Sequence, residues 1–185
     1  MKRKSVQRGI CVLLALVLVC FAGCSSDTSI KNTFAFINNQ TGERICLGQE
    51  IKTIKSEIKL FSENMGDVGD LYLEFKDGKI TALNLSVLDK SGSVFSTADG
   101  IKIGDLRSKV LEIYGKPTVV GDYLGLEYFY FYKYENGRLR KIEADEYDED
   151  VKVDRRMYFG FIEDEDIVTS IDMQSFSEDE GENYV

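Results

Sequence analysis

An internal repeat is the feature that most limits how this chain folds. The segment "ICLGQEIKTIKSEIK" at 45–59 matches "IKIGDLRSKVLEIYG" at 101–115, with Gly48 aligned with Gly104. Further along, "LYLEFKDGKITALNL" at 71–85 matches "MYFGFIEDEDIVTSIDM" at 157–173. Because the two matches keep their order, the sequence predicts two copies of one unit, each a helix followed by a pair of strands, that share one core.

The clearest helix of this repeat is expected at 105–114. Its apolar residues fall on one helical face, namely Leu106, Val110, Leu111 and Tyr114. Asp105 is expected to cap the first turn, and Gly115 to end the helix in a left-handed conformation before Pro117. A phosphate-binding loop is not indicated, because that motif places several glycines and a lysine between strand and helix.

Alternating apolar residues and glycine turns predict antiparallel hairpins. Asp77-Gly78 and Asn136-Gly137 have the composition of two-residue hairpin turns, and the second turn places Tyr132 opposite Lys141. In that second hairpin an apolar face is expected from Phe129, Phe131, Ile142 and Ala144, with tyrosines on the reverse. Helices are then expected to cover the side of the sheet that carries Leu73, Phe75, Phe129, Phe131, Phe159 and Phe161.

The expected fold class is therefore α+β, with tandem helix-plus-antiparallel-strand repeats forming one sheet and helices packed on one face. The other face of that sheet is expected to be open to water. The expected organisation is a signal peptide at 1–23, a tether at 24–33, a first repeat at 34–98, a second repeat at 99–175 with an inserted tyrosine-rich hairpin, and an acidic tail at 176–185.

The N-terminal segment has the composition of a secretory signal. A basic stretch, "MKRKSVQR", precedes thirteen apolar residues at 10–22, which as a helix span about 20 Å, short of the roughly 30 Å of a bilayer core. The following "FAGC" at 21–24 resembles a bacterial lipobox, although Phe21 stands where leucine is usual. The resemblance implies cleavage before Cys24 and a lipid on its thiol. An uncleaved anchor is the alternative, and both place the rest of the chain outside the cytoplasm at the cell membrane.

Charge and cysteine content limit the partners. The chain has 23 basic and 32 acidic residues, and removing the four basic residues of the signal leaves 19 against 32. A nucleic-acid ligand is therefore excluded, because its phosphates would be repelled. After processing, Cys46 is the one cysteine besides Cys24, so it has no internal disulfide partner. It is expected to be a small half-buried residue, with a reactive thiol as the alternative.

The second repeat resembles a known group of proteins. Its "GIKIGDLRSKVLEIYGKPT" and closing "DIVTSIDM" resemble the outer-membrane assembly lipoprotein family (SmpA/OmlA, BamE-like) and the tandem units of β-lactamase-inhibitor-protein-like folds. The first half matches less well, since it lacks the terminal Gly-x-Pro. The resemblance implies a protein-binding or scaffolding role in the envelope and no catalytic residue. No partner-binding motif of either group is present, so neither lactamase inhibition nor outer-membrane assembly follows.

A tyrosine stripe on the open face is the expected recognition surface. Tyrosine offers a large contact area with only two rotatable bonds and a polar tip. The candidate partner-binding residues are Tyr72, Tyr128, Tyr130, Tyr132, Tyr134, Lys141 and Tyr158. The alternative is that these tyrosines stand in strands for packing alone.

Catalytic and metal chemistry find little support in the sequence. The chain has no histidine, so a cysteine nucleophile would lack an imidazole base. Its many acids single out no catalytic pair, and no motif marks a Ser-Lys dyad, which stays open. The acidic runs at 143–154 and 163–166 lack the spacing of a calcium loop and are expected to be solvated, with weak divalent binding as the alternative.

No cofactor, metal site or enzymatic activity is expected. The expected function is that of a membrane-anchored extracytoplasmic lipoprotein acting as a non-catalytic protein- or envelope-binding module. Its partners would be the membrane, through the N-terminal lipid, and another envelope protein. The alternative is a small-ligand sensor or an accessory domain to a neighbouring envelope enzyme.

Overall fold

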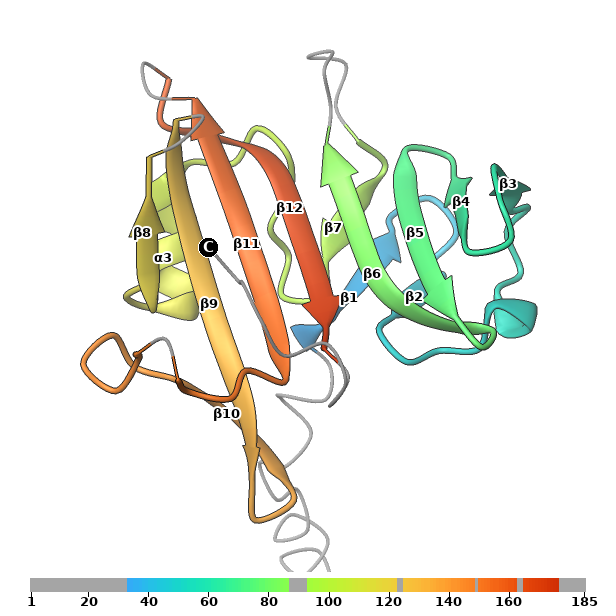
Figure 1. Cartoon of the computed structure of the whole chain (residues 1–185). Coiled ribbons are helices and arrows are strands. Elements are labelled where there is room, and N and C mark those ends of the chain that lie inside the picture. Colours follow the sequence, from blue (N-terminus) through green and yellow to red (C-terminus); the bar gives the residue numbers. More distant parts are fainter. Residues whose placement is uncertain (1–32, 87–92, 123–124, 149, 163–164, 177–185) are drawn as a thin grey trace, which may run out of the picture. The chain divides into compact units, whose positions relative to one another are not determined.

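The expected α+β architecture is wrong. The computed structural model describes residues 33–86, 93–122, 125–148, 150–162 and 165–176 (Figure 1). The protein is mostly β, and its described residues between Phe34 and Phe176 hold one α-helix, α3 (Arg107–Tyr114). A layer of helices on the sheet, one from each half of the chain, is therefore not what this sequence forms.

Two antiparallel sheets make up the described part of the chain. The large sheet has the order β10-β9-β11-β12-β6-β5-β4-β3, with β8 beside β9. Its strands are β3 (Lys59–Leu60), β4 (Met65–Val68), β5 (Leu71–Lys76), β6 (Lys79–Ser86), β8 (Val119–Gly121), β9 (Leu126–Glu135), β10 (Arg138–Lys141), β11 (Arg155–Ile162) and β12 (Ile167–Ser175). The small sheet, in the order β2-β1-β7, consists of β1 (Ala35–Asn38), β2 (Arg44–Cys46) and β7 (Phe95–Thr97). Figure 1 shows the small sheet and α3 on the same face of the large one.

Both predicted hairpin turns are confirmed. Asp77 and Gly78 have φ of 51° and 72°, and Asn136 and Gly137 have φ of 52° and 76°. Two successive residues of positive φ define the turn whose twist matches that of the flanking strands. The second turn sets the register that the sequence predicts, because Lys141 lies opposite Tyr132.

The helix ends as predicted but begins differently. Gly115, with φ of 72°, closes α3 by donating its N–H to the carbonyl of Leu111 at 2.9 Å. The expected capping role of Asp105 is wrong. Its carboxylate accepts the Lys102 N–H at 2.8 Å, one turn before the helix, instead of an N–H of α3.

The apolar face of α3 is narrower than expected. Val110 is fully buried and Tyr114 packs against the core, whereas Leu106 and Leu111 are 57% and 37% exposed. The start of the helix is held by the chain that leads into β12, because Arg107 donates its N–H to the carbonyl of Asp166 at 2.9 Å. The helix therefore contacts the sheet along one edge.

The helix expected in the first half is absent. In its place the chain forms one 3₁₀ turn, η2 (Ile51–Thr53). The loop that leads into η2 nevertheless bonds to β6 as the loop before α3 bonds to β12. The matching N–H to carbonyl bonds, all 2.8–3.0 Å, are Gly48 to Ile80, Ile80 to Gln49, Gly104 to Val168 and Val168 to Asp105. The likeness between the halves thus covers the loop and the strands, and the helix lies outside it.

The core lies between the two sheets. One row of fully buried side chains crosses five neighbouring strands of the large sheet, in the order Leu73, Leu83, Met173, Met157 and Tyr130. Phe34, just before β1, Phe36 of β1 and Val110 of α3 belong to the same apolar cluster. Burial of this apolar cluster is the main favourable contribution to folding.

The two faces of β9 were predicted the wrong way round. Tyr130 lies opposite Met157, so the tyrosines of β9 share the covered face with Phe159. Phe129 and Phe131 therefore point to the other face, where Phe131 packs in a smaller cluster with Ile142 and Val153. The assignment of Leu73, Phe75, Phe159 and Phe161 to the covered side is confirmed, since they belong to the main core.

Candidate functional site

The predicted tyrosine surface does not exist as one surface. Tyr128, Tyr130 and Tyr132 are 7%, 0% and 6% exposed. The Tyr130 hydroxyl donates to the carbonyl of Gly115 at 3.0 Å, and the Tyr132 ring meets Phe34 edge-on at 5.0 Å. Burial raises the pKa of both phenols well above the usual range. These three tyrosines are core residues, so the partner-binding surface predicted from them is wrong.

Two further predicted residues lie at the ends of the hairpin. Tyr134 is 55% exposed, beyond the covered part of β9. The Lys141 ammonium donates to the carbonyl of Lys116 at 3.1 Å and pairs with Glu143 at 3.3 Å. Lys141 therefore ties the chain after α3 to the hairpin. Cys24, the predicted lipid site, lies outside the described residues.

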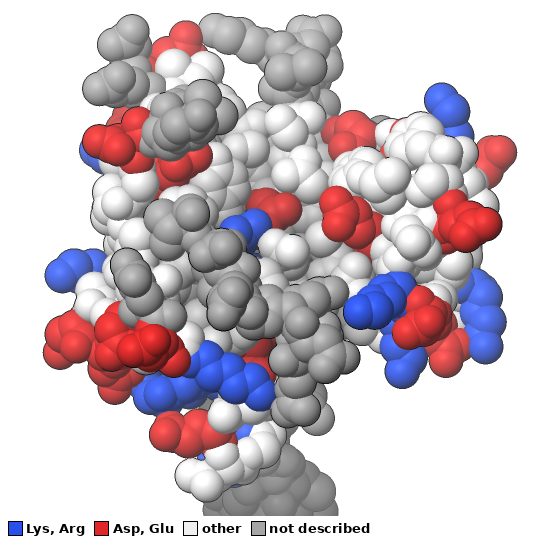
Figure 2. Space-filling model, in the orientation of Figure 1, with Lys and Arg blue, Asp and Glu red and all other residues white. Residues whose placement is uncertain are grey.

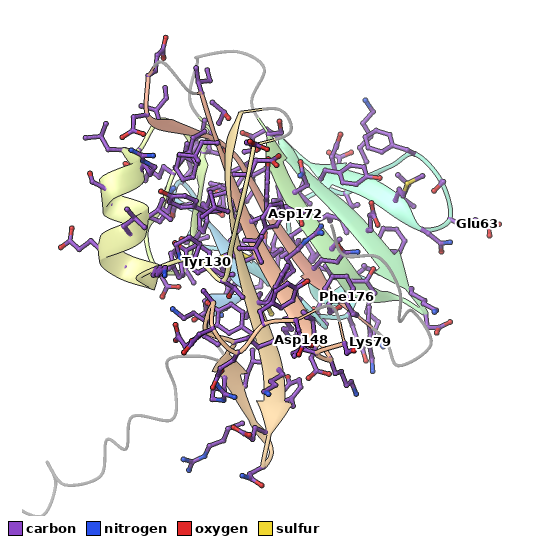
Figure 3. The ribbon with its side chains drawn as sticks, turned by 60° about the vertical axis from the view of Figure 1, so that its left-hand side comes forward. Glu63, Lys79, Tyr130, Asp148, Asp172 and Phe176 are labelled. Atoms are coloured by element: carbon purple, nitrogen blue, oxygen red, sulfur yellow. The ribbon has the colours of Figure 1, made fainter. Side chains whose placement is uncertain are left out.

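Tyr72 and Tyr158 lie together on the other face of the large sheet. A single row of paired residues runs from Tyr72 through Asn84 and Asp172 to Tyr158. At the usual strand spacing the two tyrosines are about 14 Å apart. Figure 3 shows Asp172 on the opposite side of the sheet from Tyr130. Of the seven predicted residues, these two share a row on this face of the sheet, whereas Tyr132 and Lys141 pair on β9 and β10.

The centre of that row is occupied by a packed ionic and aromatic cluster. Asp172 pairs with Arg156 at 3.2 Å, and their side chains are 18% and 23% exposed. Burial raises the pKa of Asp172, although Arg156 and Asn84 oppose the shift. The Tyr158 hydroxyl donates to Glu127 at 3.0 Å. Asp172 and Tyr158 are thus bonded as in a structural network, whereas the Nε of Arg156 is buried without a hydrogen-bond partner among the described residues.

An exposed apolar surface lies at the β3 end of the sheet. We call it the edge patch, and it consists of Phe61, Met65 and Tyr72 on the outer face of the sheet, together with Leu60, which lies around the edge on the face that carries Leu73. Leu60, Phe61 and Met65 are 61%, 52% and 38% exposed, and Phe61 stacks on Tyr72 with ring centroids 6.5 Å apart and planes 13° apart. Figure 2 shows largely uncharged surface, bordered by acidic and basic side chains, over this end of the sheet. Sequence reasoning missed the patch because "KLFSENM" has no regular period.

The edge patch also presents backbone groups. β3 is the end strand in the order of the large sheet. Phe61 donates its N–H to the carbonyl of Met65 at 2.9 Å, toward β4. Because successive residues of a strand turn their N–H and C=O groups to opposite sides, those of Leu60 point away from β4. The patch therefore combines apolar side chains with an open hydrogen-bonding edge.

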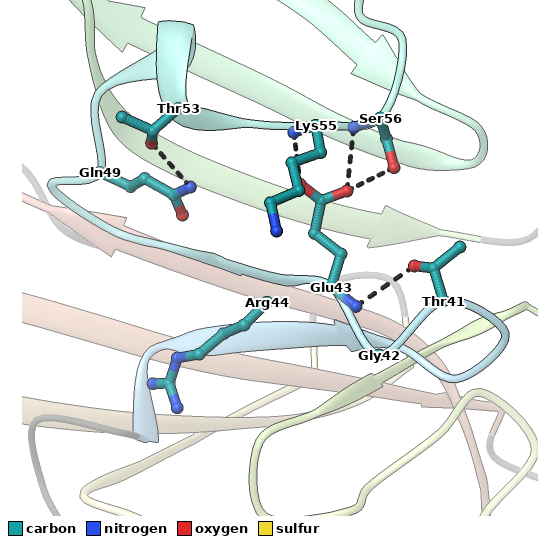
Figure 4. A pocket seen from close by; sticks show the side chains of 8 residues that line it. All are labelled: Thr41, Gly42, Glu43, Arg44, Gln49, Thr53, Lys55 and Ser56. Atoms are coloured by element: carbon teal, nitrogen blue, oxygen red, sulfur yellow. Dashed lines mark hydrogen bonds between the residues drawn. The ribbon is translucent and has the colours of Figure 1, made fainter.

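A polar hollow lies between the β1–β2 turn and η2. Its volume is about 460 Å³, which is within the range of small-molecule sites. It is lined by Thr41, Gly42, Glu43, Arg44, Gln49, Thr53, Lys55 and Ser56 (Figure 4). This hollow was not foreseen either, because its lining comes from two segments that carry no recognised motif.

Membrane-spanning helices and metal sites are both absent from the part of the chain that the structure describes. None of its helices is long and apolar enough to cross a membrane. None of its groupings of cysteine, aspartate and glutamate is arranged to hold a metal ion. Comparisons with protein-family models, with curated proteins and with solved structures found no match.

Proposed function

We propose that this chain is an extracytoplasmic lipoprotein, anchored in the membrane through Cys24, whose folded part binds another envelope protein through the edge patch. The anchor rests on the basic and apolar N-terminal segment followed by "FAGC". The binding role rests on the edge patch, in which Leu60 and Phe61 remain more than half exposed at the end of a sheet.

The proposed partner is an extended apolar segment that adds a strand beside β3. Exposed edge strands are templates for such pairing, and folded proteins usually blunt them with charge. Lys59 supplies one such charge, and its ammonium lies 5.7 Å from the Phe61 ring centroid. The two apolar side chains that follow Lys59 remain exposed, which a purely protective edge does not require. These two side chains would provide the apolar contact area for the partner. The outward N–H and C=O groups of Leu60 would hydrogen-bond to the added strand and so set its direction.

A non-catalytic role agrees with the chemistry of the chain. It has no histidine, and its buried Asp172 carboxylate is held by Arg156 and Asn84. The edge patch itself carries aliphatic and aromatic groups, which suit recognition and offer no proton transfer or nucleophile beyond a phenol.

Site-specific crosslinking in the native envelope tests the binding role. A photo-reactive amino acid at position 61 is expected to give one discrete adduct with another envelope protein. The same group at position 106 is the matched control, because Leu106 is exposed to a similar extent, 57% against 52% for Phe61, and lies outside the edge patch. Equal labelling from both positions, or no adduct from position 61, would overturn the proposal.

Two variants separate the side-chain and backbone contributions. Phe61→Ser removes the largest contact, and Leu60→Pro removes the outward N–H without breaking a bond to β4. Both are expected to reduce the adduct formed from a crosslinker at Met65, while the thermal midpoint hardly changes. A full adduct with Leu60→Pro would argue against strand addition.

A separate variant tests the lipid anchor. Cys24→Ser is expected to move the protein from the membrane fraction to the soluble fraction. If the Cys24→Ser protein stays in the membrane fraction, the lipid anchor is contradicted.

A further inference from the structure

Arg156 carries a hydrogen-bond donor that the described residues leave unpaired. Its Nη2 donates to the carboxylate of Asp172 at 3.2 Å and to the side-chain oxygen of Gln174 at 2.9 Å. Its Nε is buried and has no acceptor among the described residues. A buried N–H without an acceptor costs free energy, and folded proteins almost always supply one. An acceptor from elsewhere is therefore expected beside Arg156.

The described part of the chain ends against the same side chain. Phe176 follows β12, and its ring centroid lies 5.9 Å from the guanidinium carbon of Arg156. Its N–H donates to the carbonyl of Asp154 at 3.1 Å, and its side chain packs against the cluster that holds Phe131 and Val153. Phe176 is thus fixed beside Arg156 on the outer face of the large sheet, the face that carries Asp172.

The sequence after Phe176 is rich in acceptors. The nine residues 177–185 read "SEDEGENYV", and their carboxylates are those of Glu178, Asp179, Glu180 and Glu182. Arg156 lies opposite Gln174 on the neighbouring strand, which is about 5 Å away. Two or three extended residues, each spanning at most about 3.5 Å, cover that distance. The first carboxylates after Phe176 are therefore within reach of the unpaired N–H.

The outer face gives the rest of this segment a path. The row of Arg156 continues through Gln174 and Ala82 to Glu74. Ala82 has a small side chain, which lets another backbone approach the sheet closely. Crossing from β11 to β6 takes about 10 Å, against the roughly 30 Å that nine extended residues span. Glu74 is exposed and acidic, so an acidic segment is expected to stop short of it.

We propose that residues 177–185 lie back across the outer face as a strap, with a carboxylate from 178–180 accepting the Arg156 Nε–H. Arg156 then serves two carboxylates, that of Asp172 and that of the strap. The guanidinium suits this role, because it holds five donors in a fixed planar fork. Arg140 has the same arrangement, since its Nε donates to Glu135 at 2.9 Å and its Nη1 to Glu146 at 2.6 Å. The strap does not depend on the proposed function, which concerns β3.

A photo-reactive amino acid at position 180 of the full chain tests where the strap lies. In dilute protein purified in detergent, it is expected to form adducts within one molecule. Peptide mapping by mass spectrometry should place these adducts on β11, β12 or β6. Adducts confined to other segments would overturn the proposal, and so would the absence of any adduct. Adducts formed only between two molecules would assign the contact to a second copy and would overturn the strap as well.

Deleting residues 177–185 tests the contact with Arg156. The deletion is expected to lower the thermal midpoint by about 2–4 °C, the shift for one net hydrogen bond in a chain of this size. In an Arg156→Lys background, which keeps the positive charge but lacks the Nε–H, the same deletion should have little effect. Arg140→Lys is the matched control, because the donors of Arg140 are already occupied by Glu135 and Glu146. Equal shifts in the two lysine backgrounds, or no shift in the natural chain, would contradict the strap.

A third variant identifies the accepting group. Glu178→Gln, Asp179→Asn and Glu180→Gln together keep the length of the strap but remove three charges. Because a charge-assisted hydrogen bond is about twice as strong as a neutral one, this variant should show roughly half of the shift that the deletion causes. If it has the melting temperature of the natural chain, the carboxylates are not the acceptors and the proposal is wrong. Crosslinking from position 61 should be unchanged in all these variants, so the strap and the edge patch fail separately.

Discussion

Asn84 lies directly opposite Asp172 where β6 pairs with β12. On either side of this pair, Leu83 faces Met173 and Leu85 faces Ile171. The sequence repeat aligns 83 with 171, and therefore 84 with 172 and 85 with 173. Asn84 and Asp172 are thus each other's equivalents, and the two flanking pairs are equivalent to one another, so a local two-fold axis passes between Asn84 and Asp172. The hairpins β5–β6 and β11–β12 are related by it.

We predict that Asp172 makes the fold less stable as the pH rises. Burial raises its pKa in the folded chain above the ordinary value of 3.8, so the folded state holds the proton more tightly than the unfolded state. Its contribution therefore falls from pH 3.8 upward, through the raised pKa. The free energy of unfolding of the natural chain, relative to Asp172→Asn, should decline over this window in urea titrations. A difference that grows with pH would contradict the assignment.

Replacing Tyr130 should destabilise the protein. Its side chain is fully buried and its hydroxyl donates to the Gly115 carbonyl. Tyr130→Ser is expected to lower the free energy of unfolding by about 3–5 kcal/mol through the cavity it leaves. Tyr130→Phe should cost about 1 kcal/mol, the value of the hydrogen bond. Thermal melts check both, with Tyr134→Ser as the exposed control. If the Tyr130→Ser variant has the same melting temperature as the natural chain, Tyr130 is not a core residue.

Position 160 needs a glycine because the Tyr158 and Ser170 side chains lie directly over it. A Cβ at this position would overlap the Ser170 hydroxyl and approach the Tyr158 hydroxyl to 2.6 Å. Gly160→Ala is therefore expected to cost about 1–3 kcal/mol and to move Tyr158 away from Glu127. Adding Ser170→Ala should recover part of the loss in chemical denaturation. No recovery in the double variant would mean that the strain lies elsewhere.

Thr118 joins two backbone segments through one hydroxyl. It is 5% exposed, donates to the Ile142 carbonyl at 2.6 Å and accepts the Phe131 N–H at 3.2 Å. Thr118→Val keeps the shape but leaves both groups unpaired, at a cost of about 2–4 kcal/mol. Hydrogen exchange of the Phe131 amide should quicken. Thr118→Ser keeps the hydroxyl and should retain most of the protection, and equal loss in both variants would rule out this role.

The hairpin turns were predictable because their requirements are local. Asp-Gly and Asn-Gly supply the two positive φ angles that each turn needs, whatever the rest of the chain does. The end of α3 was predictable for the same reason, since Gly115 tolerates a φ of 72°. In each case one or two residues decide the outcome.

The faces of β9 were not predictable from its own sequence. Tyrosine and phenylalanine alternate from 128 to 132, so both faces are aromatic and neither is plainly polar. The choice is made by the pairing of Tyr130 with Met157 and by Phe34 above Tyr132. Similarly, the first half forms no helix after η2, because the N–H groups of Lys55 and Ser56 bond to the carboxylate of Glu43. Glu43 lies outside the segment whose pattern predicted the helix. The edge patch and the hollow share this dependence on distant segments.

The two-fold pairing of β6 with β12 has a consequence for how such a fold arises. A single hairpin unit would leave the strand equivalent to β6 as an open edge, with half of a core beneath it. Two separate copies would complete that sheet in the way β6 and β12 do here, as a symmetric dimer whose stability depends on concentration. Joining the copies in one polypeptide removes that dependence, and it lets one copy keep a helix while the other opens a hollow.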